Sequence, residues 1–237
     1  MTQKEGTKRF QILDGSMLKL IAVVTMLIDH TAVFLMQNNT TVLLRVSGYT
    51  LTLYTLMRTI GRISFPIYAF LLAEGYLHTR DVRQYSLNLL LFAILSEIPW
   101  NLEHTGTYLY PSSQNVFFTL FLGLAGIWVM DRFRDDIRRQ APLLLGLLLM
   151  TFLIKSDYGC RGFAFILLMY LLRDSRLHRA VVGSCILSST WKAGLAFIPI
   201  SLYNGKRGFV KGDLLKYFFY AVYPLHMLVI YYIRYRM

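Results

Sequence analysis

The sequence predicts an all-α protein, a polytopic transmembrane helical bundle of about eight or nine membrane segments with a cytoplasmic N-terminus. Of its 237 residues, 55% are hydrophobic and only 16% are charged, and the mean hydropathy is +0.46. A soluble domain of this length needs more charged side chains to cover its surface. Long apolar runs alternate with short loops that carry arginine, and no repeat or linker divides the chain. We therefore expect residues 1–237 to form a single integral membrane domain.

The predicted helices follow one another along the chain. The polar start, MTQKEGTKRFQILDG, is unlike the apolar region of a signal peptide, so we expect the first span to be retained. Residues 40–57, which contain Arg45 and many threonines, fit a short amphipathic segment better than a simple span. Residues 180–203 form either one helix or two short ones broken near residues 191–194. Apolar stretches of helical length cover residues 16–36, 59–77, 84–102, 115–131, 141–154, 160–172 and 214–234.

The distribution of basic residues predicts the orientation, because positively charged loops stay in the cytoplasm. With the N-terminus inside, the cytoplasmic segments before residue 180 hold Lys4, Lys8, Arg9, Arg80, Arg83, Arg132, Arg134, Arg138, Arg139, Arg173, Arg176 and Arg179, whereas the outer loops hold only Arg45, Arg58, Lys155 and Arg161. Beyond residue 180 the charges leave the orientation open. The net charge of +12 therefore indicates membrane anchoring rather than nucleic-acid binding, and we expect the bacterial cytoplasmic membrane as the location.

An acid and an imidazole lie side by side near the middle of the first span. The stretch AVVTMLIDHTAVFL, residues 22–35, is apolar at almost every position except Asp29 and His30. A central Asp costs roughly 3 kcal/mol in a membrane helix, so this pair requires polar partners or a water-filled cavity. Thr25 and Ala22 lie on the same helix face as Asp29, one and two turns earlier.

Other polar residues occur within or at the ends of further spans. They are Arg62 before an expected kink at Phe65-Pro66, Glu74 with His78 four residues later, Glu97 near Pro99, Gln114 and Asn115, and His226 near Pro224. One such residue alone is more often a hydrogen bonder between helices than a catalyst, and Glu74 with His78 fits a simple pair on one helix. Joint occurrence on several spans favours a site. An imidazole base, a carboxylate, a fixed cation and amide donors suit acyl transfer, and proton-coupled transport uses the same groups.

The two cysteines give no sign of a metal or disulfide site. Cys160 and Cys185 lie in or beside separate apolar segments and have no metal-ligand spacing. We expect ordinary packing roles for both, and no metal cofactor.

Six stretches of the sequence resemble the TraX family of membrane proteins. They are LDGSMLKLIAVVTMLIDH (13–30), RTIGRISFPIYAFLLAEGYLHT (58–79), FAILSEIPWNL (92–102), QNVFFTL (114–120), SLYNGKRG (201–208) and YFFYAVYPLHMLVIYYIR (217–234). The resemblance covers nearly the whole chain, and IDH with GR-x-x-FP-x-x-AF-x-x-x-EG is a fairly specific signature. TraX proteins are named for a plasmid-encoded enzyme that acetylates the N-terminal amine of pilin. They are similar to the acyltransferase-three superfamily, whose members move acetyl groups from cytoplasmic acetyl-CoA to acceptors across the membrane.

The resemblance implies a role for each matching residue. The superfamily has a DG…H pattern on its first helix and Y-x-x-H on a late one, which Asp14-Gly15…His30 and Tyr223…His226 match. His30 is then the general base or acetyl carrier.

The remaining roles follow from the same resemblance. Asp29 would orient His30, and Arg62 would stabilise charge on the thioester carbonyl or position the acceptor. The substrate pocket would be lined by Glu97, Asn115, Gln114, His226 and Glu74.

Acetyl-CoA is the co-substrate that the resemblance implies, and its phosphates need cations near the cytoplasm. NGKRG is the best local candidate, because Gly205 and Gly208 let the backbone approach an anion. Lys19 stands close after Asp14-Gly15, where the superfamily has a basic residue. The candidate phosphate-binding residues are Lys206, Arg207, Arg80, Arg83 and Arg132.

We therefore predict a membrane-embedded acetyltransferase that moves an acetyl group from cytoplasmic acetyl-CoA to an amine or hydroxyl acceptor. The acceptor is a peptide such as the pilin N-terminus, a glycan or a lipid-linked group, and direct transfer and an acetyl-histidine intermediate both stay open. One alternative is a proton-coupled transporter or exporter that uses the same buried groups, and another is a non-catalytic assembly factor. Expected partners are coenzyme A, the acceptor and membrane lipid, but not nucleic acid.

Overall fold

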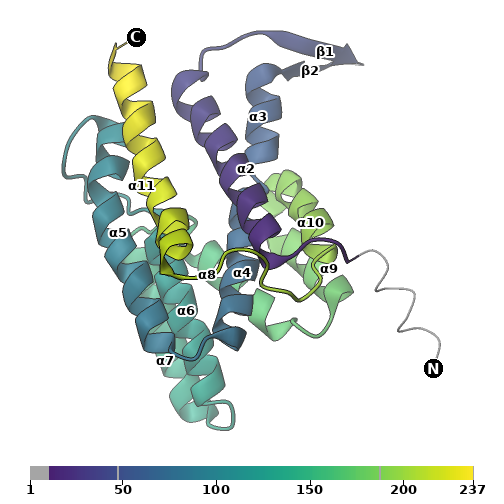
Figure 1. The fold of residues 1–237 in the computed structure, drawn as a ribbon, viewed down its shortest axis with the longest axis vertical. Helices are drawn as coiled ribbons and strands as arrows, with labels where there is room; N and C mark the ends of the chain where they lie inside the picture. Colours follow the sequence, from purple (N-terminus) through teal and green to yellow (C-terminus); the bar gives the residue numbers. More distant parts are fainter. Residues whose placement is uncertain (1–10, 47, 187, 237) are drawn as a thin grey trace.

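The computed structural model describes residues 11–46, 48–186 and 188–236, and most of these are helical (Figure 1). Two strands, β1 (Val42–Val46) and β2 (Tyr49–Thr52), form a small antiparallel sheet. The helices are α2 (Gly15–Leu35), α3 (Leu53–Gly61), α4 (Ser64–His78), α5 (Val82–Thr105), α6 (Val116–Arg132), α7 (Ile137–Leu153), α8 (Gly159–Leu171), α9 (Arg176–Ile186), α10 (Phe197–Ser201) and α11 (Asp213–Arg236), with a 3₁₀ segment η2 (Ser188–Ala196) before α10.

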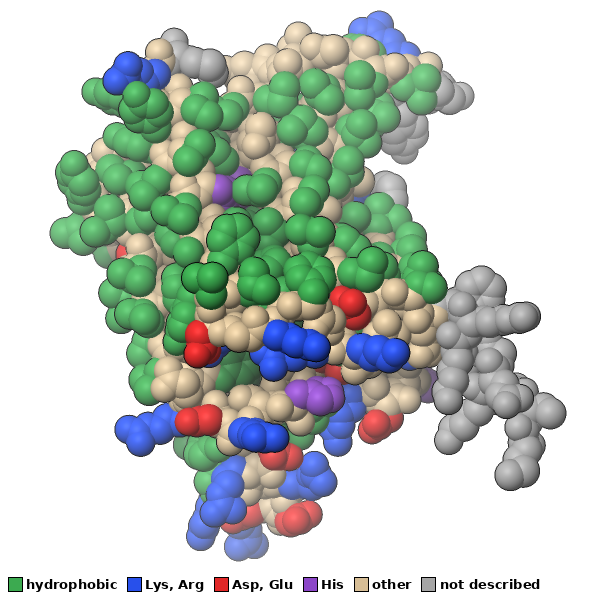
Figure 2. Space-filling model, viewed as in Figure 1, with side chains coloured by type: hydrophobic (Ala, Val, Ile, Leu, Met, Phe, Trp, Pro, Cys, Tyr) green, Lys and Arg blue, Asp and Glu red, His purple; other side chains and the backbone are tan. Residues whose placement is uncertain are grey.

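Three helical segments are long and apolar enough to cross a membrane: Gly15–Leu35, Leu53–His78 and Asp213–Arg236. Figure 2 shows apolar side chains over the upper part of one face and charged side chains gathered at its lower end. This pattern is typical of a membrane protein. The predicted helical membrane character is therefore confirmed, whereas the number of further crossings and the side on which the N-terminus lies stay predictions.

The predicted amphipathic segment at residues 40–57 is instead a β-hairpin followed by α3. Arg45 lies opposite Thr50 in the hairpin. Valine and threonine are β-branched and favour extended backbone, a preference that hydropathy does not register. Thr52 ends the hairpin and caps α3: its hydroxyl accepts from the Thr55 N–H at 3.1 Å, and the Thr55 hydroxyl oxygen accepts from the Thr52 N–H at 2.9 Å. The all-α prediction is wrong for this hairpin.

The predicted span at residues 59–77 consists of two helices. α3 ends at Gly61 and α4 begins at Ser64, while Arg62 and Ile63 between them keep backbone angles in the right-handed helical region. Pro66 is the third residue of α4, where a backbone N–H has no acceptor within the helix, so the proline removes no hydrogen bond. The expected break therefore lies just ahead of the proline and not at it.

Residues 180–203 fold as short pieces, in agreement with the broken alternative. α9 ends at Ile186, and η2 and α10 follow before the chain leaves the region. The Arg176 guanidinium donates to the Ser201 carbonyl at 3.0 Å and holds the two ends of this region together. A helical crossing needs about 20 residues, so none of these pieces spans a bilayer alone.

The start of α2 is held by residues 202–212, which we call the strap. The Gly15 N–H donates to the Lys206 carbonyl at 2.8 Å, and the Ser16 hydroxyl donates to the Arg207 carbonyl at 2.9 Å. The DG and NGKRG motifs, far apart in the sequence, therefore meet at one place.

Gly208 is required in the strap for two reasons. Its φ of +85° lies in the region that favours glycine, and a Cβ there would collide with the Asp14 carboxylate. The Asp14 carboxylate in turn accepts from the Met17 N–H at 2.9 Å and caps α2.

The helices share one apolar core. Leu18, Ile67, Phe165 and Met227 are all 0% exposed and come from α2, α4, α8 and α11. Burial of these side chains brings the first and last described helices together in the bundle.

α2 and α3 approach closely because Gly61 has no side chain. A Cβ on Gly61 would collide with the Cβ and carboxylate of Asp29. This close approach lets Asp29 reach a partner on α3.

Replacing Gly61 with alanine should separate α3 from α2 and lower the thermal stability. Overpacking costs about 1–3 kcal/mol, so we expect the melting temperature of the purified protein in detergent to fall by roughly 3–10 °C. Gly146→Ala on α7 is the matched control, because nothing lies within 4 Å of its added Cβ, and its melting temperature should be unchanged or higher. Equal melting temperatures for Gly61→Ala and the unmodified protein would contradict the close contact.

Candidate active site

Two histidines from opposite ends of the chain form a pair between α2 and α11. The Nδ1 atom of His30 lies 2.5 Å from Nε2 of His226, and the ring centroids are 4.8 Å apart with an interplanar angle of 4°. His30 is half-buried and His226 is 9% exposed. Figure 2 shows histidine side chains at the surface of this face, between α11 and α2 and surrounded by apolar side chains. His30 therefore lies in the second half of α2, and the pair is not fully enclosed.

The hydrogen bonds of this pair determine where its protons lie. His226 Nδ1 is 2.8 Å from the Val222 carbonyl, and a carbonyl only accepts, so this nitrogen carries a proton. In a neutral ring His226 Nε2 is then an acceptor, and His30 Nδ1 donates to it. The second nitrogen of His30, Nε2, keeps its lone pair and can take up a proton.

Aromatic side chains and a third histidine surround the pair. The Tyr223 ring centroid lies 6.1 Å from that of His30 and 5.6 Å from that of His226. The Phe34 ring lies 6.1 Å from His30 and 4.9 Å from His104, which hydrogen bonds at 2.9 Å to a carbonyl of its own helix, α5. His30 is therefore bordered by rings from α2, α5 and α11.

Asp29 pairs with Arg58 and does not contact the imidazole pair. Arg58 Nη1 lies 2.6 Å from Asp29 Oδ2, and the two side chains are 20% and 13% exposed. Adjacent residues on a helix point about 100° apart, so Asp29 and His30 face different neighbours. The structure does not support the predicted role of Asp29 as the orienter of His30, because His226 occupies that place.

Arg62 belongs to a neighbouring cluster. Its guanidinium contacts the Tyr158 hydroxyl and lies near the Asp157 carboxylate, both in the loop between α7 and α8. Phe65 stacks on the Tyr158 ring, with the centroids 3.8 Å apart. Arg58 and Arg62 are both within electrostatic range of His30, so two cations border the imidazole pair.

Asp157 is held in a partly desolvated position. Burial raises its pKa to about 6, although the Tyr158 N–H and the Arg62 guanidinium favour the charged form. The Tyr158 N–H donates to the Asp157 carboxylate at 3.0 Å, and the Asp157 carbonyl accepts from the Thr119 hydroxyl. These bonds attach the loop to α6 beside Arg62.

Glu97 and Asn115 form a buried cap at the start of α6. The Asn115 amide donates to the Glu97 carboxylate and to the Ala93 carbonyl, the latter at 2.8 Å, and its oxygen accepts from the Phe117 N–H at 3.0 Å. The backbone of Gln114 pairs with the α7–α8 loop. The side chains of Glu97 and Asn115 therefore bond to each other and to the start of α6, whereas Gln114 is held through its backbone.

Glu74 lies away from this site. It is twelve residues after Arg62, which corresponds to roughly 18 Å along a helix. Its neighbours include Arg179 and Tyr203. His78 hydrogen bonds at 2.8 Å to the Glu74 carbonyl and not to its carboxylate. Glu74 therefore lies apart from the imidazole pair, and its predicted place in the substrate pocket stays a prediction.

A group of cations gathers where the strap meets α2 and α11. Lys19 lies near Arg207 and Lys216, and we call these three residues the basic cluster. No ion pair with a carboxylate involves any of them within the described ranges. The strap also carries Lys206, so two of the predicted coenzyme A residues lie at this place.

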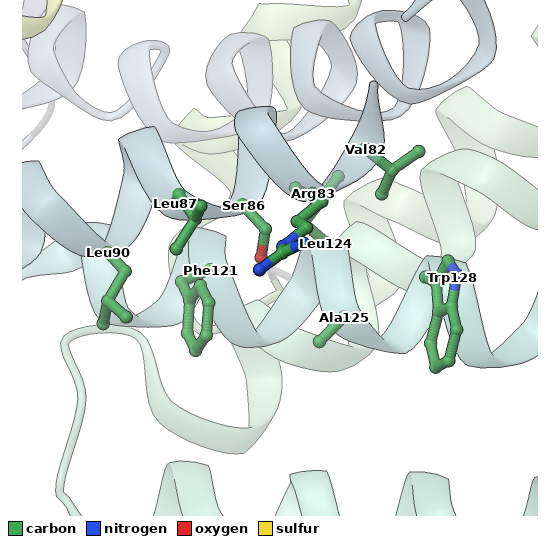
Figure 3. A pocket seen from close by; sticks show the side chains of 9 residues that line it. All are labelled: Val82, Arg83, Ser86, Leu87, Leu90, Phe121, Leu124, Ala125 and Trp128. Atoms are coloured by element: carbon green, nitrogen blue, oxygen red, sulfur yellow. The ribbon is translucent and has the colours of Figure 1, made fainter. Parts of the chain in front are cut away.

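The other basic candidates lie elsewhere. Arg80 and Arg83 are exposed at the start of α5, and Arg132 is exposed at the end of α6. Arg83 lines a surface groove of about 320 Å³ between α5 and α6, which Figure 3 shows from close by. The predicted basic residues therefore do not form one site.

The two cavities described here, both within the described residues, are not lined by the imidazole pair. Besides the groove between α5 and α6, a second surface cavity of about 340 Å³ lies between α7 and α8 and is lined in part by Thr151, Lys155 and Cys160. In the part of the chain that the structure describes, no three His, Cys, Asp or Glu side chains are placed to hold a metal ion.

The sequence matches the family model described as "TraX protein" over residues 14–234. The chain belongs to the TraX family. It is 25% identical to "Probable fimbrial assembly protein FimC, serogroup H1" of Dichelobacter nodosus over 242 residues, which cover 89% of this chain and 91% of that protein. No solved structure matches the chain. The TraX match includes the imidazole pair, the strap and the basic cluster.

Several residues of this TraX site carry little signal in the sequence. Arg58 lies one turn before Arg62, and this spacing is the only indication that both face the same side. Asp157 and Tyr158 lie in a short loop, and His104 lies near a helix end, where polar residues are ordinary. Only the folded chain brings them beside the histidines.

Asp157→Asn should change how the thermal stability of this TraX protein depends on pH. The folded pKa of about 6 lies above the unfolded value of roughly 3.9, so the folded state binds more protons between these values, and the stability contribution of Asp157 falls as the pH rises from about 4 to 6. The melting temperature of Asp157→Asn minus that of the unmodified protein should therefore rise from pH 4 to pH 6 and then stay level. A difference that does not vary with pH would contradict the raised pKa.

Proposed function

We propose that this TraX-family chain is a membrane-embedded acetyltransferase that transfers the acetyl group of acetyl-CoA to an amine or hydroxyl acceptor. The observation that carries the proposal is the imidazole pair. The Val222 carbonyl orients His226, His226 orients His30, and Nε2 of His30 remains as a base among apolar helices. A neutral imidazole with one nitrogen fixed by a hydrogen bond is the usual general base of acyl transfer.

The proposed step uses this base directly. The acceptor nitrogen or oxygen attacks the thioester carbonyl carbon while His30 Nε2 takes up the acceptor proton. The carbon–sulfur bond then breaks, the carbonyl of the product re-forms, and His30 passes the proton to the coenzyme A sulfur. General-base catalysis of this kind contributes roughly 10²–10⁴ in rate.

Arg58 and Arg62 supply the positive charge that the step needs. Negative charge develops on the carbonyl oxygen during attack, and fixed cations in an apolar site stabilise it strongly. Asp29 holds Arg58, and the α7–α8 loop holds Arg62, so neither guanidinium has to reorganise during the reaction. Asp29 then acts through Arg58 and not through His30.

The basic cluster is the proposed site for the coenzyme A phosphates. Lys19 and His30 lie on the same helix, eleven residues apart, which is roughly 16 Å along its axis. The extended pantetheine arm of coenzyme A, which joins the phosphates to the thioester, has a comparable length. The cluster carries three positive charges with no ion-paired carboxylate in the described ranges.

We propose seven helical crossings, with the N-terminus and the basic cluster on the cytoplasmic side of a bacterial cytoplasmic membrane. They are α2, α3 with α4, α5, α6, α7, α8 and α11. α8 has only 13 residues, and we count it as a crossing because it packs against α4 and α6 within the bundle. The number is smaller than the eight or nine expected from hydropathy because residues 176–201 form only short pieces. Basic residues in the loops at one end of the bundle favour this orientation.

The acceptor is proposed from the name of the relative. A protein 25% identical to this chain is named a probable fimbrial assembly protein. A fimbrial subunit with a free amine is therefore the first acceptor to test, before a glycan or a lipid-linked group. A relationship to the acyltransferase-three superfamily is part of the same proposal.

His30→Gln should reduce acetyl transfer by about 10²–10⁴-fold, because no other group takes the acceptor proton. The measurement is release of coenzyme A from radiolabelled acetyl-CoA by the purified protein with a peptide amine, and His226→Gln should also lose most activity. His78→Gln, away from the pair, should retain the full rate. Unchanged turnover in His30→Gln would remove His30 as the base. If acetyl-CoA stays intact and vesicles that contain the protein take up a solute only when a proton gradient is present, the protein is instead a proton-coupled transporter.

Lys19→Ala combined with Arg207→Ala should weaken coenzyme A binding at least tenfold, because phosphates lose two cationic partners. Titration calorimetry measures the affinity, and Arg80→Ala combined with Arg132→Ala is the control with the same loss of charge. Lys206→Ala shows whether the strap lysine contributes as well. Equal affinities in the cluster and control variants would exclude the basic cluster as the phosphate site.

A further inference from the structure

The groove between α5 and α6 has an apolar floor that opens outward. Leu87, Leu90 and Phe121 line one part of it, and Leu87 is 49% exposed (Figure 3). Trp128, 44% exposed, lines the part nearest the end of α6. The groove lies at the end of α5 and α6 toward which charged side chains gather in Figure 2. Aromatic residues in membrane proteins concentrate at such a boundary.

The polar part of the groove is a cation and a hydroxyl. Figure 3 shows the Arg83 guanidinium extended across the groove beside the Ser86 hydroxyl. Arg83 is exposed, and no ion pair in the described ranges includes it. An arginine fork with a neighbouring hydroxyl suits a phosphate group.

We propose that this groove binds one acyl chain of an anionic phospholipid from the cytoplasmic leaflet, with the lipid phosphate paired to Arg83. The assignment to the cytoplasmic leaflet depends on the orientation proposed above, whereas the proposed binding of a lipid in the groove does not. Basic pockets between transmembrane helices at the cytoplasmic side are recurrent sites for anionic lipid head groups.

The dimensions and chemistry of the groove favour lipid over other occupants. A volume of about 320 Å³ accommodates a length of acyl chain but not a second helix, which would need a longer apolar face. Coenzyme A is disfavoured here, because its nucleotide end carries several phosphate groups, whereas Arg83 is the one cation among the residues that line the groove. The site is separate from the basic cluster, which lies at α2, the strap and α11.

Trp128 provides a built-in probe of the bound lipid. The variant Trp100→Phe with Trp191→Phe leaves Trp128 as the only tryptophan of three. It is reconstituted into phosphatidylcholine vesicles that contain bromine-labelled acyl chains on either phosphatidylglycerol or phosphatidylcholine, at equal bromine content. Because one cation near the surface favours an anionic lipid about fivefold, quenching of Trp128 fluorescence should show about a fivefold preference for phosphatidylglycerol.

Arg83→Gln should abolish this preference, and Arg80→Gln, a neighbouring arginine outside the groove, should keep it. Inorganic phosphate should not compete with the lipid. If the double tryptophan variant does not fold, the difference in quenching between the unmodified protein and Trp128→Phe gives the same quantity. Equal quenching by the two lipids, or a preference that survives Arg83→Gln, would overturn the proposal. Neither readout involves acetyl transfer, so failure here is distinguishable from failure of the proposed activity.

Discussion

Polar groups inside an apolar bundle have no water to bond with and must find partners in the protein, and this constraint organises the whole structure. Asp29 pairs with Arg58 across α2 and α3, while His30 pairs with His226 across α2 and α11. Since Asp29 and His30 are adjacent, they project from α2 in different directions and connect it to two helices at once. α2 is therefore the helix around which the polar interior is arranged.

The same constraint explains why chemistry is proposed at one nitrogen only. Asn115 spends its bonding capacity on the fold, because it caps α6 and donates to Glu97. The chain of bonds through His226 ends at His30, whose Nε2 keeps a lone pair. A carboxylate in the place of His226 would add a buried charge, whereas a second imidazole orients His30 without one.

The strap fixes the other end of α2, where the helix begins. Ser16 and Gly15 bond to strap carbonyls, so the strap side chains, including Arg207, are carried toward the start of the helix. Arg207 then lies near Lys19, and like charges at such proximity are stable only where an anion or water screens them. One helix thus links a cationic end to a basic nitrogen in its second half, which is the geometry on which the proposed acetyl transfer depends.

The sequence by itself determined the membrane class, most helix positions and the choice of His30 and His226 as candidates, because hydropathy and the cost of a buried polar group are local properties. Tertiary structure decided the partners: Arg58 for Asp29 and His226 for His30. It also decided that residues 42–52 form a hairpin, since β-branched residues outweigh a helical reading there. Partner choice depends on which faces of distant helices meet, and a single sequence specifies that only through packing of the whole bundle.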